Sequence, residues 1–138
     1  MAGALSRSGL RHDVRMKNTA ITVYGIRNCD TVKKARQWLD EHGQPYVFHD
    51  FKTEGVPPAL LDHWMEQVGW ETLLNRKGTT WRRLDEATRA SVVDAAGARA
   101  VMLEHPSTIK RPVVAWGGPT NKDVSVGFKA ELWETRLV

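Results

Sequence analysis

A strand–helix–strand pattern near the start of the chain constrains the fold most strongly. Residues 20–26 and 45–51 are rich in β-branched and aromatic side chains, so each predicts a strand. Between them a helix is expected over roughly 29–42, because apolar residues recur at helical spacing and a glycine follows. The residues that set this pattern are Val32, Ala35, Leu39 and Gly43. A connection of this length joins parallel strands, so the segment predicts a βαβ unit of an α/β fold.

The residue pattern changes from strand-like to turn-rich and then helical after the second predicted strand. Residues 52–58 are rich in turn formers and predict a linker. A helix is expected next, with prolines at its entrance, Gly69 at its exit and one apolar face. That face consists of Leu60, Leu61, Trp64, Met65 and Val68. A short helical segment around 70–74 then precedes a stretch that predicts a basic loop, residues 75–83.

Two further helices are expected before the chain returns to strands. The first covers about 85–96, with Asp85 as its N-cap and Gly97 as its terminator. The second covers about 98–105 and is closed by a proline. Residues 57–105 are therefore interpreted as a helical insertion in an α/β domain.

The last part of the chain predicts a β-hairpin and a helix. Residues 111–116 predict one strand, a glycine- and proline-rich turn follows, and residues 124–126 predict the next strand. Apolar residues then indicate a C-terminal helix: Phe128, Leu132, Trp133 and Leu137. The order βαβ, helices, ββα predicts one domain over residues 19–138.

The net charge of +4 is concentrated at the start of the chain. Residues 1–18 carry four Lys and Arg against one Asp, so the remainder carries only +1 and gives no argument for nucleic-acid binding. Their small, polar and basic composition predicts a disordered extension, with Met16 as a candidate natural start and a basic targeting arm as the alternative. No apolar run approaches the about 20 residues of a membrane span, so a membrane protein is not expected.

Cys29, the only cysteine, falls at the predicted start of the first helix. A helix N-terminus stabilises a thiolate, and Lys33 one turn later adds positive potential, whereas Asp30 opposes it. An inert buried thiol is the alternative for a lone cysteine. A single cysteine forms no internal disulfide and fits a reducing, cytoplasmic location, so redox turnover needs a thiol from another molecule.

Two other segments contain candidate anion-binding residues. Arg111 precedes Pro112 at the start of a predicted strand, and from sequence alone a trans peptide bond is the default. For Arg111 itself, a plain surface charge is the alternative to a binding role. In the basic loop, Arg76 and Thr79 offer a guanidinium fork and a hydroxyl for an anion; a solvated loop is the alternative. The five histidines show no metal-ligand spacing, so no metal site is predicted.

Three segments taken in order resemble the glutaredoxin-like arsenate reductase/Spx family, in particular its YffB-type branch. They are YGIRNCDTVKKA at 24–35, NRKGT at 75–79 and IKRP at 109–112. The resemblance covers residues 19–138 and implies a thioredoxin/glutaredoxin-like fold with an inserted helical subdomain. It supports the order of elements derived above.

The resemblance also implies roles for individual residues. Cys29 matches the catalytic cysteine of the family, and Arg111 matches the arginine before its cis-proline, which would be Pro112. Arg76 matches the arginine of a leucine–leucine–arginine segment, with Asn75 intervening here. Arsenate reductases of this kind use a further arginine downstream, where this chain offers only Lys122.

These features predict a glutathione-dependent monothiol reductase that performs thiol–disulfide exchange or deglutathionylation and holds no bound cofactor. Cys29 would be the nucleophile, and its partner would be glutathione or a thiol-bearing protein. The residues expected to bind glutathione or an anionic substrate are Arg76, Arg111, Pro112, Lys33 and Thr79. One alternative is a non-catalytic Spx-like interaction module, with RNA polymerase as partner by analogy, although Val32 replaces the second cysteine of the C-x-x-C switch in Spx. Arsenate reduction is the other alternative.

Overall fold

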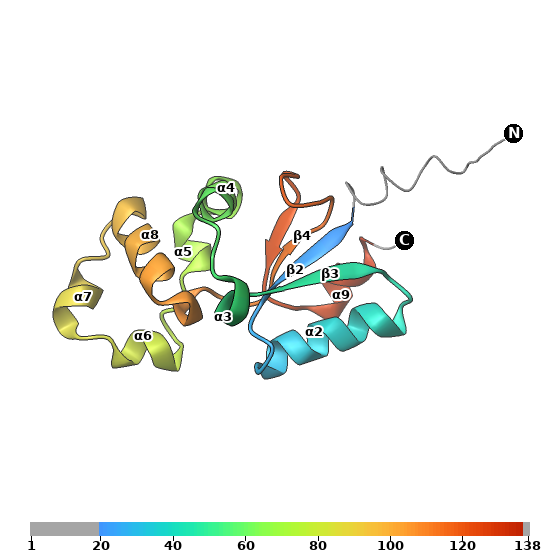
Figure 1. Cartoon of the computed structure of the whole chain (residues 1–138), viewed down its shortest axis with the longest axis horizontal. Helices are drawn as coiled ribbons and strands as arrows, with labels where there is room; N and C mark the ends of the chain where they lie inside the picture. The colour runs from blue at the N-terminus through green and yellow to red at the C-terminus, as the bar shows by residue number, and fades with distance from the viewer. Residues whose placement is uncertain (1–19, 137–138) are drawn as a thin grey trace, which may run out of the picture.

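The computed structural model describes residues 20–136, which form a four-stranded mixed sheet with helices (Figure 1). The strand order is β3-β2-β4-β5. Strand β2 (Ile21–Gly25) pairs in parallel with β3 (Tyr46–Asp50) and antiparallel with β4 (Val113–Ala115). β4 in turn pairs antiparallel with β5 (Val124–Val126). The predicted parallel pair and the predicted hairpin are both confirmed.

Helix α2 (Asp30–Glu41) connects the two parallel strands and covers one face of the sheet. Its inward side chains are buried at the predicted helical spacing: Val32, Ala35, Trp38 and Leu39. The chain leaves the helix through Gly43, whose φ of 64° is a left-handed conformation that glycine adopts without strain. The predicted helix and its stop are therefore confirmed.

The short helix α9 (Ala130–Glu134) packs on the same side of the sheet as α2. Trp133 is buried there, with its ring 5.6 Å from that of Trp38 and 5.0 Å from that of Trp116. Leu132, which the sequence assigned to the same apolar group, is instead 59% exposed. Leu137 and the predicted disordered extension lie outside the described residues.

Short helical elements fill the chain between β3 and β4. They are α3 (Phe51–Glu54), α4 (Pro58–Val68), α5 (Trp70–Leu73), α6 (Thr79–Arg83), α7 (Glu86–Ala90), α8 (Ala95–Glu104) and the 3-10 turn η1 (Pro106–Thr108). The predicted α4 and its exit glycine are confirmed, and Asp85 caps α7 by accepting a hydrogen bond from the Thr88 amide at 2.7 Å. Among these described helices, none has the length and hydrophobicity that a bilayer span requires.

Three expectations for this region were wrong. The predicted linker begins with α3, because the Asp50 carboxylate caps it by accepting from the Lys52 amide at 2.9 Å. The predicted basic loop ends in α6. The break between the last two helices falls before Asp94, not at Gly97, because the Asp94 carboxylate accepts from the Gly97 amide at 2.9 Å and starts α8 there.

A second hydrophobic core joins the helical elements to the other face of the sheet. Trp64, Met102 and Ile109 are fully buried in it, together with Tyr24 of β2. Two backbone hydrogen bonds connect the end of α5 to the chain after η1: Lys110 N to Leu73 O at 2.7 Å and Asn75 N to Thr108 O at 2.8 Å. These bonds hold the segment before Arg76 against the segment before Arg111.

Candidate active site around Cys29

Cys29 occupies the N-cap position of α2, three residues after the buried end of the β2 segment at Ile26. Its backbone is extended, with φ −146° and ψ 125°, and its carbonyl accepts the Lys33 amide at 2.9 Å. The side chain is half-buried. The βαβ connection therefore places the thiol where the first amides of the helix are free of carbonyl partners.

The surroundings of the thiol favour its ionised form. Partial burial by itself raises the pKa of Cys29, but the Val32 amide, the Arg111 guanidinium through a hydrogen bond and its charge, and the Thr31 amide all lower it. The sum is a pKa below the ordinary value. The sulfur forms no standard capping hydrogen bond, because sulfur is a weak acceptor; the amides act on it as dipoles and partial donors. The amides at the helix start and Arg111 therefore favour the thiolate of Cys29, which is the reactive form of cysteine.

Arg111 reaches the thiol from a different part of the fold. Its Nη1 donates to the carbonyl of Ser107 at 2.8 Å, and its Nε is buried with no hydrogen-bond partner among the described residues. The Arg111–Pro112 peptide bond is cis, as the family resemblance implied. Pro112 is buried and its carbonyl accepts the Gly127 amide at 2.8 Å, which ties this segment to the end of β5.

Arg76 lies in a separate surface hollow of about 230 Å³. The hollow is lined by Glu71, Leu74, Asn75, Arg76, Lys77 and Lys110. The guanidinium of Arg76 lies 5.1 Å from the ring of Trp70, and Thr79 is the exposed first residue of α6. Arg76 therefore belongs to the surface beside Lys110, the neighbour of Arg111, and is not among the groups that lower the pKa of Cys29.

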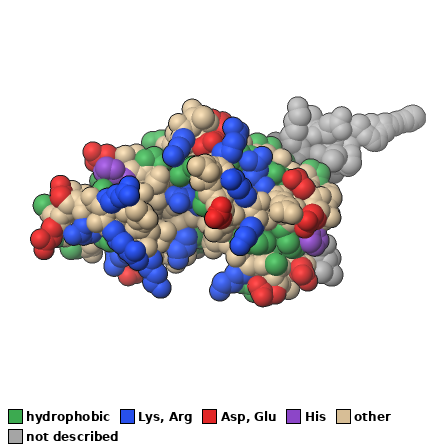
Figure 2. Space-filling view, turned by 90° about the horizontal axis from the view of Figure 1, so that it is seen from below, with side chains coloured by type: hydrophobic (Ala, Val, Ile, Leu, Met, Phe, Trp, Pro, Cys, Tyr) green, Lys and Arg blue, Asp and Glu red, His purple; other side chains and the backbone are tan. Residues whose placement is uncertain are grey.

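Lys33 lines another hollow, of about 270 Å³, on the surface of α2. Its other lining residues are Arg27, Arg36, Gln37, Asp40 and Tyr46. Helices α2 and α6 lie on the lower side of the molecule in Figure 1 and face the viewer in Figure 2, where Lys and Arg side chains lie across the middle of the face. Lys33 contributes its charge to this surface rather than to the thiol.

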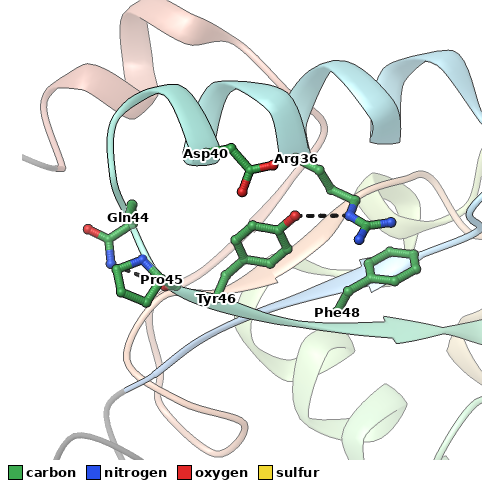
Figure 3. A pocket seen from close by; sticks show the side chains of 6 residues that line it. All are labelled: Arg36, Asp40, Gln44, Pro45, Tyr46 and Phe48. Atoms are coloured by element: carbon green, nitrogen blue, oxygen red, sulfur yellow. Dashed lines mark hydrogen bonds between the residues drawn. The ribbon is translucent and has the colours of Figure 1, made fainter.

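Arg36 is a functional candidate that sequence analysis missed. Its Nε donates to the Tyr46 hydroxyl at 3.0 Å, and its guanidinium lies 4.1 Å from the ring centre of Phe48 (Figure 3). An adjoining hollow of about 400 Å³ opens beside these side chains. The signal was present, because Lys33 and Arg36 are three residues apart on one helix and share a face. Within residues 20–136 no three metal-ligating side chains lie close enough together to hold an ion.

The profile of the ArsC family matches residues 24–135, which include Cys29, Arg76 and Arg111. The chain belongs to the ArsC family. An uncharacterised protein of Haemophilus influenzae is 45% identical over 98 residues, which is 71% of this chain and 85% of that protein. Global transcriptional regulator Spx 1 of Lactococcus lactis is 24% identical and aligns with 80% of this chain and 84% of its own length.

Solved structures of ArsC-family relatives have the same fold. A protein named YFFB is 48% identical and covers 86% of this chain and 100% of its own, with a TM-score of 0.79. An arsenate reductase (ArsC) related protein from Brucella melitensis is 49% identical and covers 86% and 94% of the two chains, with a TM-score of 0.66. The thioredoxin-like α/β fold and the resemblance to the arsenate reductase/Spx family and its YffB-type branch are confirmed.

Proposed function

We propose that this ArsC-family protein is a monothiol reductase that acts on mixed disulfides, with glutathione as its co-substrate. The observation that carries the proposal is the placement of Cys29, half-buried at the α2 N-terminus with the Arg111 guanidinium beside it and a lowered pKa. A thiolate at neutral pH is the reactive form for attack on a disulfide. The second thiol must come from outside, because the chain contains one cysteine.

The reaction proceeds through two exchanges of one disulfide bond. The Cys29 thiolate attacks the glutathione sulfur of a protein–glutathione mixed disulfide; the bond to the protein breaks, and the protein thiolate leaves and takes a proton from solvent. The thiolate of a second glutathione then attacks the Cys29–glutathione disulfide. Oxidised glutathione leaves with the new disulfide bond, and Cys29 returns as a thiolate.

Arg111 has two tasks in this scheme. Its positive charge stabilises Cys29 as attacking thiolate in the first step and as leaving thiolate in the second. The buried Pro112, whose carbonyl accepts the Gly127 amide, ties the segment that carries Arg111 to the sheet. Arg76, Thr79 and Lys33 remain candidate contacts for the glutathione carboxylates.

Alkylation of Cys29 as a function of pH tests the proposal. The half-maximal rate is expected below the about pH 8.5 of an ordinary cysteine, and Arg111→Ala is expected to shift it upward. Turnover of a glutathionylated peptide by glutathione should disappear in Cys29→Ser. An alkylation midpoint at or above about 8.5, or turnover that survives Cys29→Ser, contradicts the proposal.

A non-catalytic binding role is the second candidate, and the similarity to a protein named as a transcriptional regulator favours it. Val32 stands where the C-x-x-C switch would need its second cysteine, so such binding would not respond to an internal disulfide. Co-purification with RNA polymerase that persists in Cys29→Ser, without turnover by the wild type, would support this role.

Arsenate reduction is the third candidate. The further arginine of arsenate reductases is absent from residues 121–127, where the only cation is the exposed Lys122. A multiply charged oxyanion would therefore lose electrostatic stabilisation. We expect only slow reduction of arsenate with glutathione and glutaredoxin, and a rate comparable to that with the glutathionylated peptide would reverse this order.

A further inference from the structure

Two basic hollows open on the elements on either side of the α2 N-terminus, and the scheme above uses them only for candidate contacts of Lys33 and Arg76 with glutathione carboxylates. The α2 hollow holds three cations against one carboxylate: Arg27, Lys33, Arg36 and Asp40. The insertion hollow has the same balance: Arg76, Lys77, Lys110 and Glu71. Each is an open surface depression into which side chains of a partner can reach.

The chain connects both hollows directly to Cys29. Arg27 precedes Cys29 by two positions, and the amide of Lys33 is bonded to the Cys29 carbonyl. On the other side, Lys110 is the neighbour of Arg111, one of the groups that lower the pKa of Cys29. In Figure 1 the N-terminus of α2, where Cys29 lies, is between the body of α2 on one side and the connection from α5 to α6 on the other. One hollow is built on α2 and β3, and the other on the α5–α6 connection of the helical insertion.

The cations of both hollows lack carboxylate partners. In residues 20–136, Lys and Arg form ion pairs at Arg99–Asp62 and Arg136–Asp123, and neither pair belongs to a hollow. Arg36 is held in place instead by the Tyr46 hydroxyl and the Phe48 ring, which fix its guanidinium without neutralising it (Figure 3). Clustered cations of one sign are stabilised by an external anion, and an ordered arginine loses less entropy when it binds one.

We propose, building on the reductase function above, that the substrates are proteins whose reactive cysteine is flanked by acidic side chains on both sides, which bind the two hollows. Glutathione carries two carboxylates, fewer than the six Lys and Arg side chains that line the two hollows, so it leaves cations there without an anionic partner. A nucleic acid carries the negative charge but no sulfur for Cys29 to exchange with. An acidic protein supplies both the charge and the disulfide.

Charge complementarity of this kind acts mainly on the association rate. Attraction between a basic face and an acidic partner raises association rates by about 10- to 1,000-fold, and the gain falls steeply as salt is added. The selectivity should therefore reside in kcat/KM at low ionic strength, and should be lost at high ionic strength.

Two synthetic peptides that differ only in charge test the proposal. Each has one cysteine in a mixed disulfide with glutathione; the first has two Glu on each side of the cysteine, and the second has Gln in their place. With the full-length protein at low salt, we expect kcat/KM to be at least about tenfold higher for the Glu peptide. The ratio should approach one in 0.5 M salt and in the double variant Arg36→Glu, Lys77→Glu.

The matched control is Lys122→Glu, the same charge change in the loop between β4 and β5, outside both hollows. It should keep the ratio of the wild type. Because each ratio compares two peptides on one protein sample, a general loss of activity in a variant leaves the comparison intact.

Three outcomes separate this proposal from the reductase function. Equal rates for the two peptides overturn the acidic-substrate proposal and leave the reductase function standing. If neither peptide turns over, the reductase function falls, and salt-sensitive binding of the Glu peptide to Cys29→Ser still decides whether the hollows bind acidic chains. Displacement of that peptide by a short DNA duplex at lower concentration would assign the surface to nucleic acid and overturn the proposal.

Discussion

The half of the molecule that carries Cys29 and the half that carries Arg76 are built in different ways. Helix α2 is 12 residues long and buries four side chains against the sheet. In the insertion, helices α6 and α7 have five residues each, and neither contains a fully buried residue. The thiol is therefore positioned by core packing, whereas the cations of the insertion are positioned by caps, turns and partly buried contacts.

The two halves nevertheless share one core. Trp64 of α4 lies with its ring 4.7 Å from that of Tyr24 in β2, and Val113 of β4 belongs to the same cluster. The inner layer of the insertion is thus part of the packing of the sheet. The two halves therefore differ only in how their outer layers are packed. Substitutions in the shared core and in the outer layer of the insertion test this by their effects on the free energy of unfolding.

The largest effect is expected from Trp64→Ala. Trp64 is fully buried between sheet and insertion, so its truncation should lower the free energy of unfolding by about 3–5 kcal/mol. Denaturant titration followed by circular dichroism measures this. Trp133→Ala, in the core between α2 and the sheet, should lower the free energy of unfolding by a similar amount. Both variants should still unfold in a single transition. Two separate transitions in either variant would show that the halves are independent.

Val93→Ala is the control for that pair. Val93 is 77% exposed in the outer layer of the insertion, and its truncation should change the free energy of unfolding by less than about 0.5 kcal/mol. A cost near that of Trp64→Ala would mean that the outer layer is covered in solution.

The next largest effect is expected from Gly97→Ala, and the informative result is whether this substitution raises or lowers the free energy of unfolding. In a helix interior, alanine is ordinarily more stable than glycine by about 1 kcal/mol. Here an added Cβ would lie 2.6 Å from the backbone oxygen of Ser91, so we expect a net loss of about 1–3 kcal/mol from overpacking. Ala100→Gly, at an exposed position in the interior of the same helix, is the control and should lose about 1 kcal/mol. A stabilised Gly97→Ala variant would contradict the close approach.

The same glycine shows why sequence analysis succeeded in one half and failed in part of the other. The βαβ unit was predictable because Val32, Ala35 and Leu39 repeat the period of a helix that buries one face. A glycine after an apolar stretch equally fits a helix end and a close contact between segments. Gly97 serves the second purpose, and only the fold brings Ser91 against it.

The candidate site was predictable to a similar extent. A thiol at a helix start follows from local pattern, and the cis bond at Pro112 was implied by resemblance alone. Arg111, which lowers the pKa of Cys29, lies 82 positions away in the sequence, and no local pattern encodes such a long-range effect. Lys33 and Arg76 were selected as neighbours of the thiol, whereas their side chains line the two separate hollows.

A smaller effect is expected at the caps that define the outer layer. Asp94→Ala removes the carboxylate that accepts from the Gly97 amide, so the free energy of unfolding should fall by about 1 kcal/mol. Asp94→Asn retains a capping acceptor and should be close to the wild type. If both variants lose the same amount, the charge at the α8 N-terminus matters more than the hydrogen bond.

The smallest effect, and the one that concerns the thiol half directly, is a pH dependence of stability. The folded protein lowers the pKa of Cys29, so the unfolded chain binds more protons between the folded pKa and the ordinary value of about 8.5. Across that window the wild type should gain stability relative to Cys29→Ser as pH rises. The gain is complete above about 8.5 and is lost as pH falls through the folded pKa.

Paired denaturant titrations of wild type and Cys29→Ser from pH 5 to 9.5 would measure this gain. The serine hydroxyl is a good N-cap and adds a constant difference between the two proteins, which does not alter the slope. Gly97→Ala changes no ionisable group, so its difference from the wild type should stay flat over the same range. If the difference for Cys29→Ser is also flat, the amides and Arg111 do not stabilise the thiolate. The half that carries Cys29 would then differ from the insertion in its packing alone, and not in its electrostatics.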